Sequence, residues 1–418
     1  MTVRYFQRGL IVVSILALSA ISAGAQSSRP RRVQPKPEPQ KKQDSLLLPQ
    51  PTPTPASKTK NVPLLDIQPV KPVGNAPAPP APAADTTHAF LLFQQGQYEA
   101  SAKEAKQVAA SDPQNAEAWK LAGFSEMGLK KYADASADLQ KALDLQRAAK
   151  QEDSHTIDEL AQAYFFAEQF DRALPLLVSS TARAGTPPDA QMIYYRAFAE
   201  YKTGKIADAE KSFNSVLKLN PKDSSSLLYL GQIALARNDL DGAIAALNRA
   251  TVNDPRLANA WAQLTSVYLR RAAAATDETK ADADYLSAVR AGEGLIKLRT
   301  DEDALILFGN ALIGSKQYAR AAAALERAAA GKDAKETTFY LLGVAQSRAK
   351  DFPKAIAALE RAAQLKPNDV NVYRELGYAY EVTKQYAKAL AVYEKGLTIV
   401  PGDADFKESA DRVRPFAK

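Results

Sequence analysis

The stretch that decides the fold is NVYRELGYAY at residues 371–380, followed by YAKALAVY at 386–393 and by Pro401. Its first part places apolar and small residues at helical spacing, and its second part does the same after a short polar break. The proline that follows marks the end of the second helix, because proline has no amide proton to donate. The stretch therefore predicts one helical hairpin, that is, two helices joined by a short turn.

The same pattern recurs along the chain. The preceding unit has matching residues 34 positions earlier, at Phe339, Leu342, Gly343, Phe352, Ala355, Leu359, Ala362 and Pro367. Further units carry Leu227, Leu230, Gly231, Leu240, Ala243, Leu247, Ala250 and Pro255, and Trp119, Gly123, Tyr132, Ala135, Leu139 and Ala142. A fixed period of this length is typical of repeat arrays, in which neighbouring units stack to bury apolar stripes that no unit buries alone.

Nine units are expected, and they begin near residues 82, 116, 154, 190, 224, 258, 302, 336 and 370. Three of them depart from the pattern. The first and third have Ala89 and Ala161 where glycine is usual, and the third carries Pro175, which should kink its second helix. The sixth has Thr265 at the glycine position and an insertion at 272–283, which is expected to form a loop or a helix extension.

These units resemble the tetratricopeptide repeat family, whose pattern is a large apolar residue, Leu-Gly, an aromatic residue, two alanines and a closing proline. The resemblance covers roughly residues 85–401. It implies an all-α fold, an α-solenoid that winds as a right-handed superhelix of about nine helical hairpins. Residues 402–418, with Phe406 and Val413 among charged residues, are expected to form a capping helix on the last hairpin.

Residues 1–25 have the pattern of a bacterial secretory signal peptide. Arg4 and Arg8 precede an apolar run at 9–20, and Ala23-Gly24-Ala25 forms a small-residue cleavage site. The apolar run is shorter than the roughly 20 residues that a membrane span needs. We expect cleavage after Ala25 and a periplasmic or secreted protein, with an uncleaved N-terminal membrane anchor as the alternative.

Residues 26–84 are expected to be a disordered, proline-rich linker. They hold 15 of the chain's 25 prolines, and proline at this density prevents helix and sheet formation. Two apolar islands interrupt this segment, at 46–48 and at 62–67. Each island is either chance apolar content or a docking motif for a partner or for the protein's own groove.

The net charge of +7 does not indicate nucleic-acid binding. Residues 1–81 hold 11 Lys or Arg and 3 Asp or Glu, whereas residues 82–418 hold 43 and 44. The near-neutral repeats lack the clustered cations that a nucleic-acid-binding face needs. The sequence has no cysteine and only two histidines, His88 and His155, and it has no phosphate-binding loop, nucleophile motif or paired metal-ligand motif. We therefore expect no enzyme activity, no cofactor and no metal.

The resemblance implies that protein partners lie along a concave groove lined by the first helix of each hairpin. Residues at the groove positions, many of them aromatic, are Lys120, Phe124, Phe165, Tyr194, Phe198, Tyr201, Arg270, Tyr340, Arg374 and Tyr378. The alternative is that these residues belong to the core between repeats. We expect a scaffold or adaptor that binds peptide or helical segments of other proteins outside the cytoplasm. A second hypothesis is a structural spacer or a peptidoglycan-associated envelope scaffold that acts through its basic proline-rich tail. The sequence does not identify the partner.

Overall fold

The computed structural model describes residues 85–185 and 187–418, and this part of the chain is built from α-helices and one short 3-10 helix, with no strand. The predicted signal peptide and the whole of the predicted proline-rich linker lie outside the described residues. No helix in the described part has both the length and the apolar content that crossing a membrane requires.

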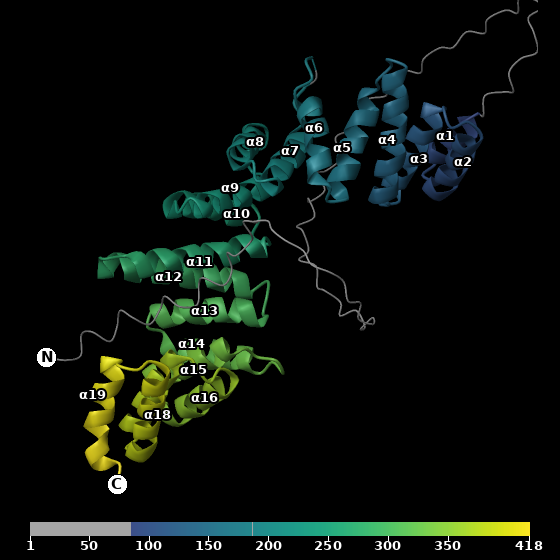
Figure 1. Cartoon of the computed structure of the whole chain (residues 1–418). Helices are drawn as coiled ribbons and strands as arrows, with labels where there is room; N and C mark the ends of the chain where they lie inside the picture. Colours follow the sequence, from purple (N-terminus) through teal and green to yellow (C-terminus); the bar gives the residue numbers. More distant parts are fainter. Residues whose placement is uncertain (1–84, 186) are drawn as a thin grey trace, which may run out of the picture. The chain divides into compact units, whose positions relative to one another are not determined.

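The described chain divides into two compact units, residues 85–229 and 230–418. The first contains α1 (Thr87–Gln94), α2 (Tyr98–Ser111), α3 (Ala116–Gly128), α4 (Tyr132–Ala148), α5 (Ser154–Phe166), α6 (Phe170–Thr181), α7 (Ala190–Lys202) and α8 (Ile206–Leu219), as Figure 1 shows. Helix α9 (Ser224–Ala236) crosses the boundary. The second contains α10 (Leu240–Asn253), α11 (Ala258–Ala274), α12 (Glu278–Ile296), α13 (Glu302–Gly314), α14 (Tyr318–Ala329), α15 (Glu336–Arg348), α16 (Phe352–Leu365), α17 (Val370–Val382), α18 (Tyr386–Ile399), α19 (Ala404–Val413) and η2 (Arg414–Phe416).

Helices pair along the chain as the repeats predict, and each hairpin also packs on the next within its unit. The first helices of the second to ninth hairpins begin at 116, 154, 190, 224, 258, 302, 336 and 370, which are the predicted residues. Asparagine or aspartate commonly precedes them. Asn115, Asp153, Asp189 and Asp369 each accept a hydrogen bond from a backbone N–H of the first turn, which satisfies a donor that the helix itself leaves free.

Close packing within a hairpin explains the glycine of the Leu-Gly pair. A Cβ atom added at Gly343 would lie 2.5 Å from Leu359 Cγ on the second helix of the same hairpin. Gly123 faces Leu139 at the same separation. The two helices therefore approach more closely than a side chain at this position would allow.

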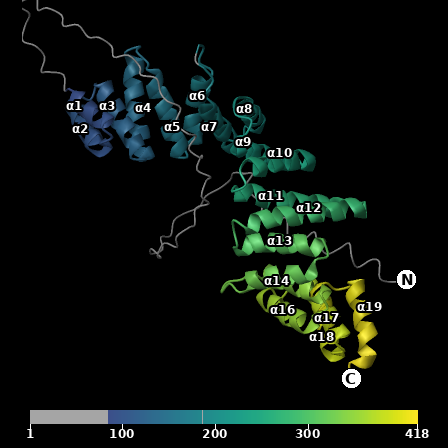
Figure 2. The same ribbon diagram turned by 180° about the vertical axis from the view of Figure 1, so that it is seen from behind.

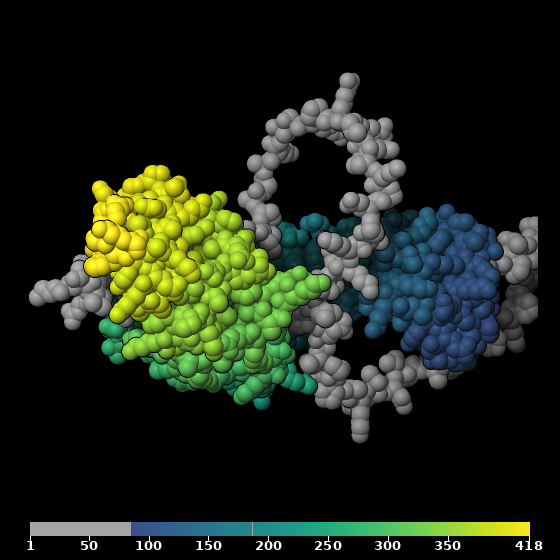
Figure 3. All heavy atoms as spheres, turned by 90° about the horizontal axis from the view of Figure 1, so that it is seen from below, coloured from purple at the N-terminus to yellow at the C-terminus, as the bar shows by residue number. Residues whose placement is uncertain are grey.

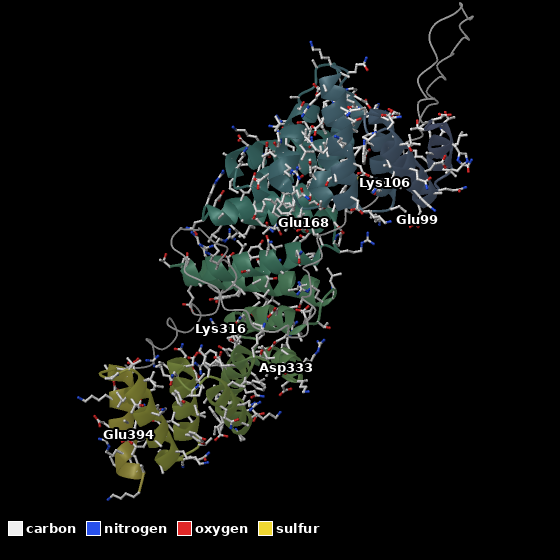
Figure 4. All side chains as sticks on the ribbon, turned by 45° about the vertical axis from the view of Figure 1, so that its right-hand side comes forward. Glu99, Lys106, Glu168, Lys316, Asp333 and Glu394 are labelled. Carbon is white, nitrogen blue, oxygen red and sulfur yellow. The ribbon has the colours of Figure 1, made fainter. Side chains whose placement is uncertain are left out.

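In eight of the nine hairpins, the turn places one residue in the left-handed backbone region; the sixth hairpin, with its insertion, has none. The residues that occupy this position are Gly96, Lys130, Glu168, Gly204, Asn238, Lys316, Lys350 and Lys384. The φ angles of the non-glycine members range from 58° to 66°. Figure 4 labels two of them, Glu168 and Lys316. Residues other than glycine pay a steric cost in this conformation, so most of these turns are locally strained.

The irregular repeats keep the hairpin by changing helix length. In the sixth hairpin, the insertion extends α11 to Ala274 and lengthens α12 to 19 residues, which confirms a helix extension. Helix α6 continues through Pro175, so this proline does not end the helix.

The C-terminal helix covers the end of the last hairpin, as predicted. Helix α19 packs on α18, and Phe406 is buried against Gly396. Figure 2 shows α19 beside the α17–α18 hairpin, and in Figure 3 the atoms of these C-terminal helices gather at one end of their unit. Phe406 thereby supplies the apolar cover that a following repeat would provide elsewhere in the array.

Candidate partner-binding surface

The predicted aromatic strip of the unit 85–229 is largely core. Phe165, Phe198 and Tyr229 come from three successive hairpins, and the Phe198 ring centroid lies 5.5 Å from that of Phe165 and 5.2 Å from that of Tyr229. Phe198 is only 3% exposed, so at this residue the structure favours the alternative, a core between repeats, over an open groove. Tyr201 is half-buried with its ring 5.3 Å from Tyr229. Burial strongly raises the pKa of Tyr194, which matches its position among these rings.

Phe124 packs against the same hydrophobic cluster as Phe165 and Tyr194. Its ring is half-buried, with its centroid 6.4 Å from that of Phe93 on α1. Binding of a partner by Phe124, Phe165, Tyr194 or Tyr201 stays a prediction, since nothing in the structure tests it.

Two predicted cationic residues connect one hairpin to the next. Lys120 Nζ lies 3.4 Å from Oδ2 of Asp153, which caps α5, and Arg374 Nη2 lies 2.6 Å from Oδ2 of Asp403, which caps α19. Both cations occupy the fifth position of their repeat. Burial by itself would raise the pKa of Asp153, but hydrogen bonds and the Lys120 charge outweigh it, and the net shift is downward. These pairs fix neighbouring hairpins in register.

In the unit 230–418, Tyr340 is also buried, so its ring does not line an open groove in this structure. A bidentate ion pair next to it joins α15 to α17. Arg348 donates to the two oxygens of Glu375 at 2.9 and 3.0 Å. Arg270 is exposed, and it donates a 2.7 Å hydrogen bond to Asn238 Oδ1 at the turn of the preceding hairpin.

Tyr378 is the predicted groove residue that stays most accessible as an apolar surface. It is 44% exposed on α17, and Val382, one turn later on the same helix, is 42% exposed. The half-buried ring of Phe352, at the start of α16, meets the Tyr378 ring edge-on with centroids 6.3 Å apart. We call these three residues the Tyr378 patch. The sequence analysis did not name Val382 or Phe352 among the groove residues.

A cavity of about 170 Å³ adjoins the Tyr378 patch between α17 and the two helices that follow. Its lining consists of Arg374, Tyr378, Glu381, Tyr393, Asp405, Phe406, Ser409 and Arg412. Arg412 donates to Glu381 at 2.8 and 3.1 Å, and the Arg374 guanidinium lies over the Phe406 ring, 5.0 Å from its centroid. The surface thus combines an accessible aromatic ring with a rim of charges that are already paired. Such a surface favours an apolar anchor over a charged one.

Within residues 85–185 and 187–418, no group of three or more His, Asp or Glu side chains is arranged to hold a metal ion. The predicted absence of a metal and of catalysis stays a prediction.

Comparison with family models gives matches to the tetratricopeptide repeat at residues 86–152, 196–258, 306–370 and 340–404, which together span more than half of the chain. Proteins of this kind are generally non-catalytic repeat scaffolds that bind proteins or peptides.

Curated relatives and solved structures share the repeat. Cellulose synthase 1 operon protein C of Komagataeibacter xylinus is 32% identical over 78 residues, which are 18% of this chain and 6% of that protein. A related protein of Komagataeibacter sucrofermentans is 31% identical over 78 residues, and the chain again spans 6% of its length. The C-terminal part of a repeat protein from Cytophaga hutchinsonii superposes with a TM-score of 0.46 and 17% identity, and covers 60% of this chain and 97% of that one. YrrB, described as a TPR protein with an unusual peptide-binding site, superposes with a TM-score of 0.40 and 20% sequence identity. The match covers 48% of this chain and 97% of YrrB.

Proposed function

Because the chain belongs to the tetratricopeptide repeat family, we propose that it is a scaffold that binds segments of partner proteins and that the Tyr378 patch is a docking point for them. The observation that carries this proposal is the exposure of Tyr378 and Val382 on one face of α17, since the other predicted groove aromatics are half-buried or buried. The curated relatives support only the presence of the repeat. They do not indicate in which cellular process this protein acts, because the alignment covers 6% of the length of the first of them.

The chemistry of the patch defines the partner segment. Tyr378 and Phe352 offer ring surface to a large apolar side chain, and a rigid tyrosine buries much area at small entropic cost. Arg374, Arg412 and Glu381 at the rim are already paired, so charges on the partner would mainly steer its approach. The occupant is therefore a peptide or helical segment with at least one aromatic or long aliphatic anchor.

Peptide display against the full chain tests this proposal. We expect selected peptides to share an apolar anchor and to bind the Tyr378→Asp variant roughly 30-fold or more weakly, which corresponds to an anchor of about 2 kcal/mol. Val252→Asp is the matched control, because Val252 is an exposed apolar residue on α10 of the same unit. Equal loss of binding in both variants, or in neither, would exclude the patch as the docking point.

We also propose that the protein acts outside the cytoplasm, on the strength of the signal-peptide pattern at residues 1–25. Expression of the full chain in a bacterial host, followed by fractionation and N-terminal sequencing, tests it. A periplasmic or secreted product that begins at Gln26 supports cleavage after Ala25, and a membrane-bound product that begins at Met1 supports the anchor. An intact chain in the cytoplasm contradicts export.

A further inference from the structure

The outer face of the first helix is apolar and open. On α1, Phe90 is 47% and Leu91 is 46% exposed, while Ala89 is buried. The main contacts of α1 are with α2 and α3, which lie on its other side. Gln94 is also exposed, three and four residues after Leu91 and Phe90, and so it lies on the same stripe of the helix.

The other repeats show what this face lacks. Leu91 occupies the tenth position of its repeat, and the residues at that position in the following repeats are Ser125, Ala163, Ala199, Ile233, Val267, Ala311, Ala345 and Ala379, every one of them buried. Ser125 shows what buries this position, because its hydroxyl donates a 2.8 Å hydrogen bond to Ser101 on the preceding hairpin. From residue 85 onward, the structure shows no hairpin before α1 to bury this position, as one does elsewhere.

The two ends of the array differ. The last hairpin carries α19, whose Phe406 is buried against α18, whereas within the described residues no comparable helix precedes α1. Terminal repeats need a polar or covered outer face, because an open apolar face promotes association. Phe90 and Leu91 give α1 an apolar outer face instead.

We propose that residues 62–67 of the same chain, Val-Pro-Leu-Leu-Asp-Ile, bind the outer face of α1 and cover Phe90 and Leu91. The segment contains four apolar residues that can pack against Phe90 and Leu91, namely Val62, Leu64, Leu65 and Ile67. Seventeen residues separate Ile67 from Asp85, enough to span roughly 50 Å and so to return to a helix that begins two residues later. Tethering at so short a distance keeps the loss of chain entropy small.

Charge favours the same contact. Residues 26–84 hold nine Lys or Arg and three Asp or Glu, a balance of +6, while the unit 85–229 holds 16 and 20, a balance of −4. Lys58 and Lys60 precede the segment. The side chain of Glu99, on α2 of the first hairpin and labelled in Figure 4, is 85% exposed. Opposite charges on the tail and on its docking unit raise the rate of encounter. The proposal concerns a different surface from the Tyr378 patch, so the failure of one leaves the other standing.

The absence of cysteine from the sequence allows a direct test by disulfide cross-linking in the full chain. We expect the Leu65→Cys/Gln94→Cys variant to form an intramolecular disulfide under mild oxidation. The matched control is Leu47→Cys/Gln94→Cys, which places the thiol in the other apolar island. Equal cross-linking in both variants would overturn the proposal, and so would disulfide-linked dimers, which would assign the face to a second copy of the chain.

Hydrogen exchange provides a second measurement that needs no new thiol. We expect Leu64→Asp/Leu65→Asp to lower the hydrogen-exchange protection of α1 amides by about tenfold or more, because the substitutions remove the apolar contact of two leucines with α1. Leu46→Asp/Leu47→Asp should leave α1 unchanged, and α3 in both variants reports whether the array stays folded. Unchanged protection of α1 in the first variant would also overturn the proposal.

Discussion

Glu126→Gln should remove a pH dependence of stability that arises in the second hairpin. Glu126 lies on α3 with its side chain almost fully buried, and it forms an ion pair with Lys106 of α2. Lys106 Nζ also lies 3.3 Å from Oδ2 of Asp138 on α4, so one cation serves two buried carboxyl groups. Glu126 Oε2 makes no hydrogen bond within the described chain. Figure 4 labels Lys106, which lies on α2 of the preceding hairpin.

The direction follows from the raised pKa. Burial raises the pKa of Glu126 to about 7, against the attraction of Lys106, and burial raises that of Asp138 as well. Because the unfolded chain releases the Glu126 proton near pH 4.5 and the folded chain holds it until about pH 7, folding stability falls as pH rises through this window. A rise of the pKa from 4.5 to about 7 corresponds to on the order of 3 kcal/mol.

The assay is thermal or denaturant unfolding of the full chain between pH 4.5 and pH 8, combined with hydrogen exchange of α3. We expect the stability of Glu126→Gln to match that of the wild type near pH 4.5 and to exceed it above pH 7, by up to about 3 kcal/mol. The control is Glu99→Gln, since Glu99 is exposed and lies 3.8 Å from Lys131, and it should leave the pH profile unchanged. A Glu126→Gln profile parallel to that of the wild type would refute the reasoning.

Three further predictions concern packing, backbone and charge. Gly343→Ala should destabilise the unit 230–418 by about 1–3 kcal/mol in denaturant unfolding, because its Cβ would press on Leu359; Gly331→Ala, whose nearest neighbour is 3.5 Å away, should not, and equal effects would contradict the packing argument. Lys350→Gly should raise the free energy of unfolding by roughly 0.5–1 kcal/mol, because φ is 66° there. Lys395→Gly inside α18 should lower it, and a loss of stability at both sites would contradict the assignment of strain. Arg348→Ala should cost about 3–5 kcal/mol by leaving Glu375 buried without its cation, and adding Glu375→Ala should recover part of this loss in a double-mutant cycle; no recovery would show that packing alone was lost.

The hairpins and their boundaries could be predicted because each depends on local residues. Helical spacing, the glycine of the Leu-Gly pair and the closing proline lie within one unit of about 34 residues. A single unit is weak evidence, but the same pattern in many units makes the assignment specific. The salt bridges of Lys120 and Arg374 to the element that follows each of them were missed. Lys120 and Arg374 hold the same repeat position, and each reaches the aspartate that caps the first helix of the next element.

The sequence by itself determined that the chain is an array of helical hairpins and where the second to ninth of them begin, and it predicted a row of groove residues. Only the tertiary structure decided which members of that row reach the surface. Phe198 and Tyr378 are aromatic residues at the same ninth repeat position, yet one is 3% and the other 44% exposed. Phe198 packs between Phe165 of the preceding hairpin and Tyr229 of the following one. Tyr378 lies in the last hairpin, and its ring meets that of Phe352 in the preceding hairpin. Exposure at a repeat position depends on the side chains of neighbouring hairpins, and the pattern within one repeat does not contain them.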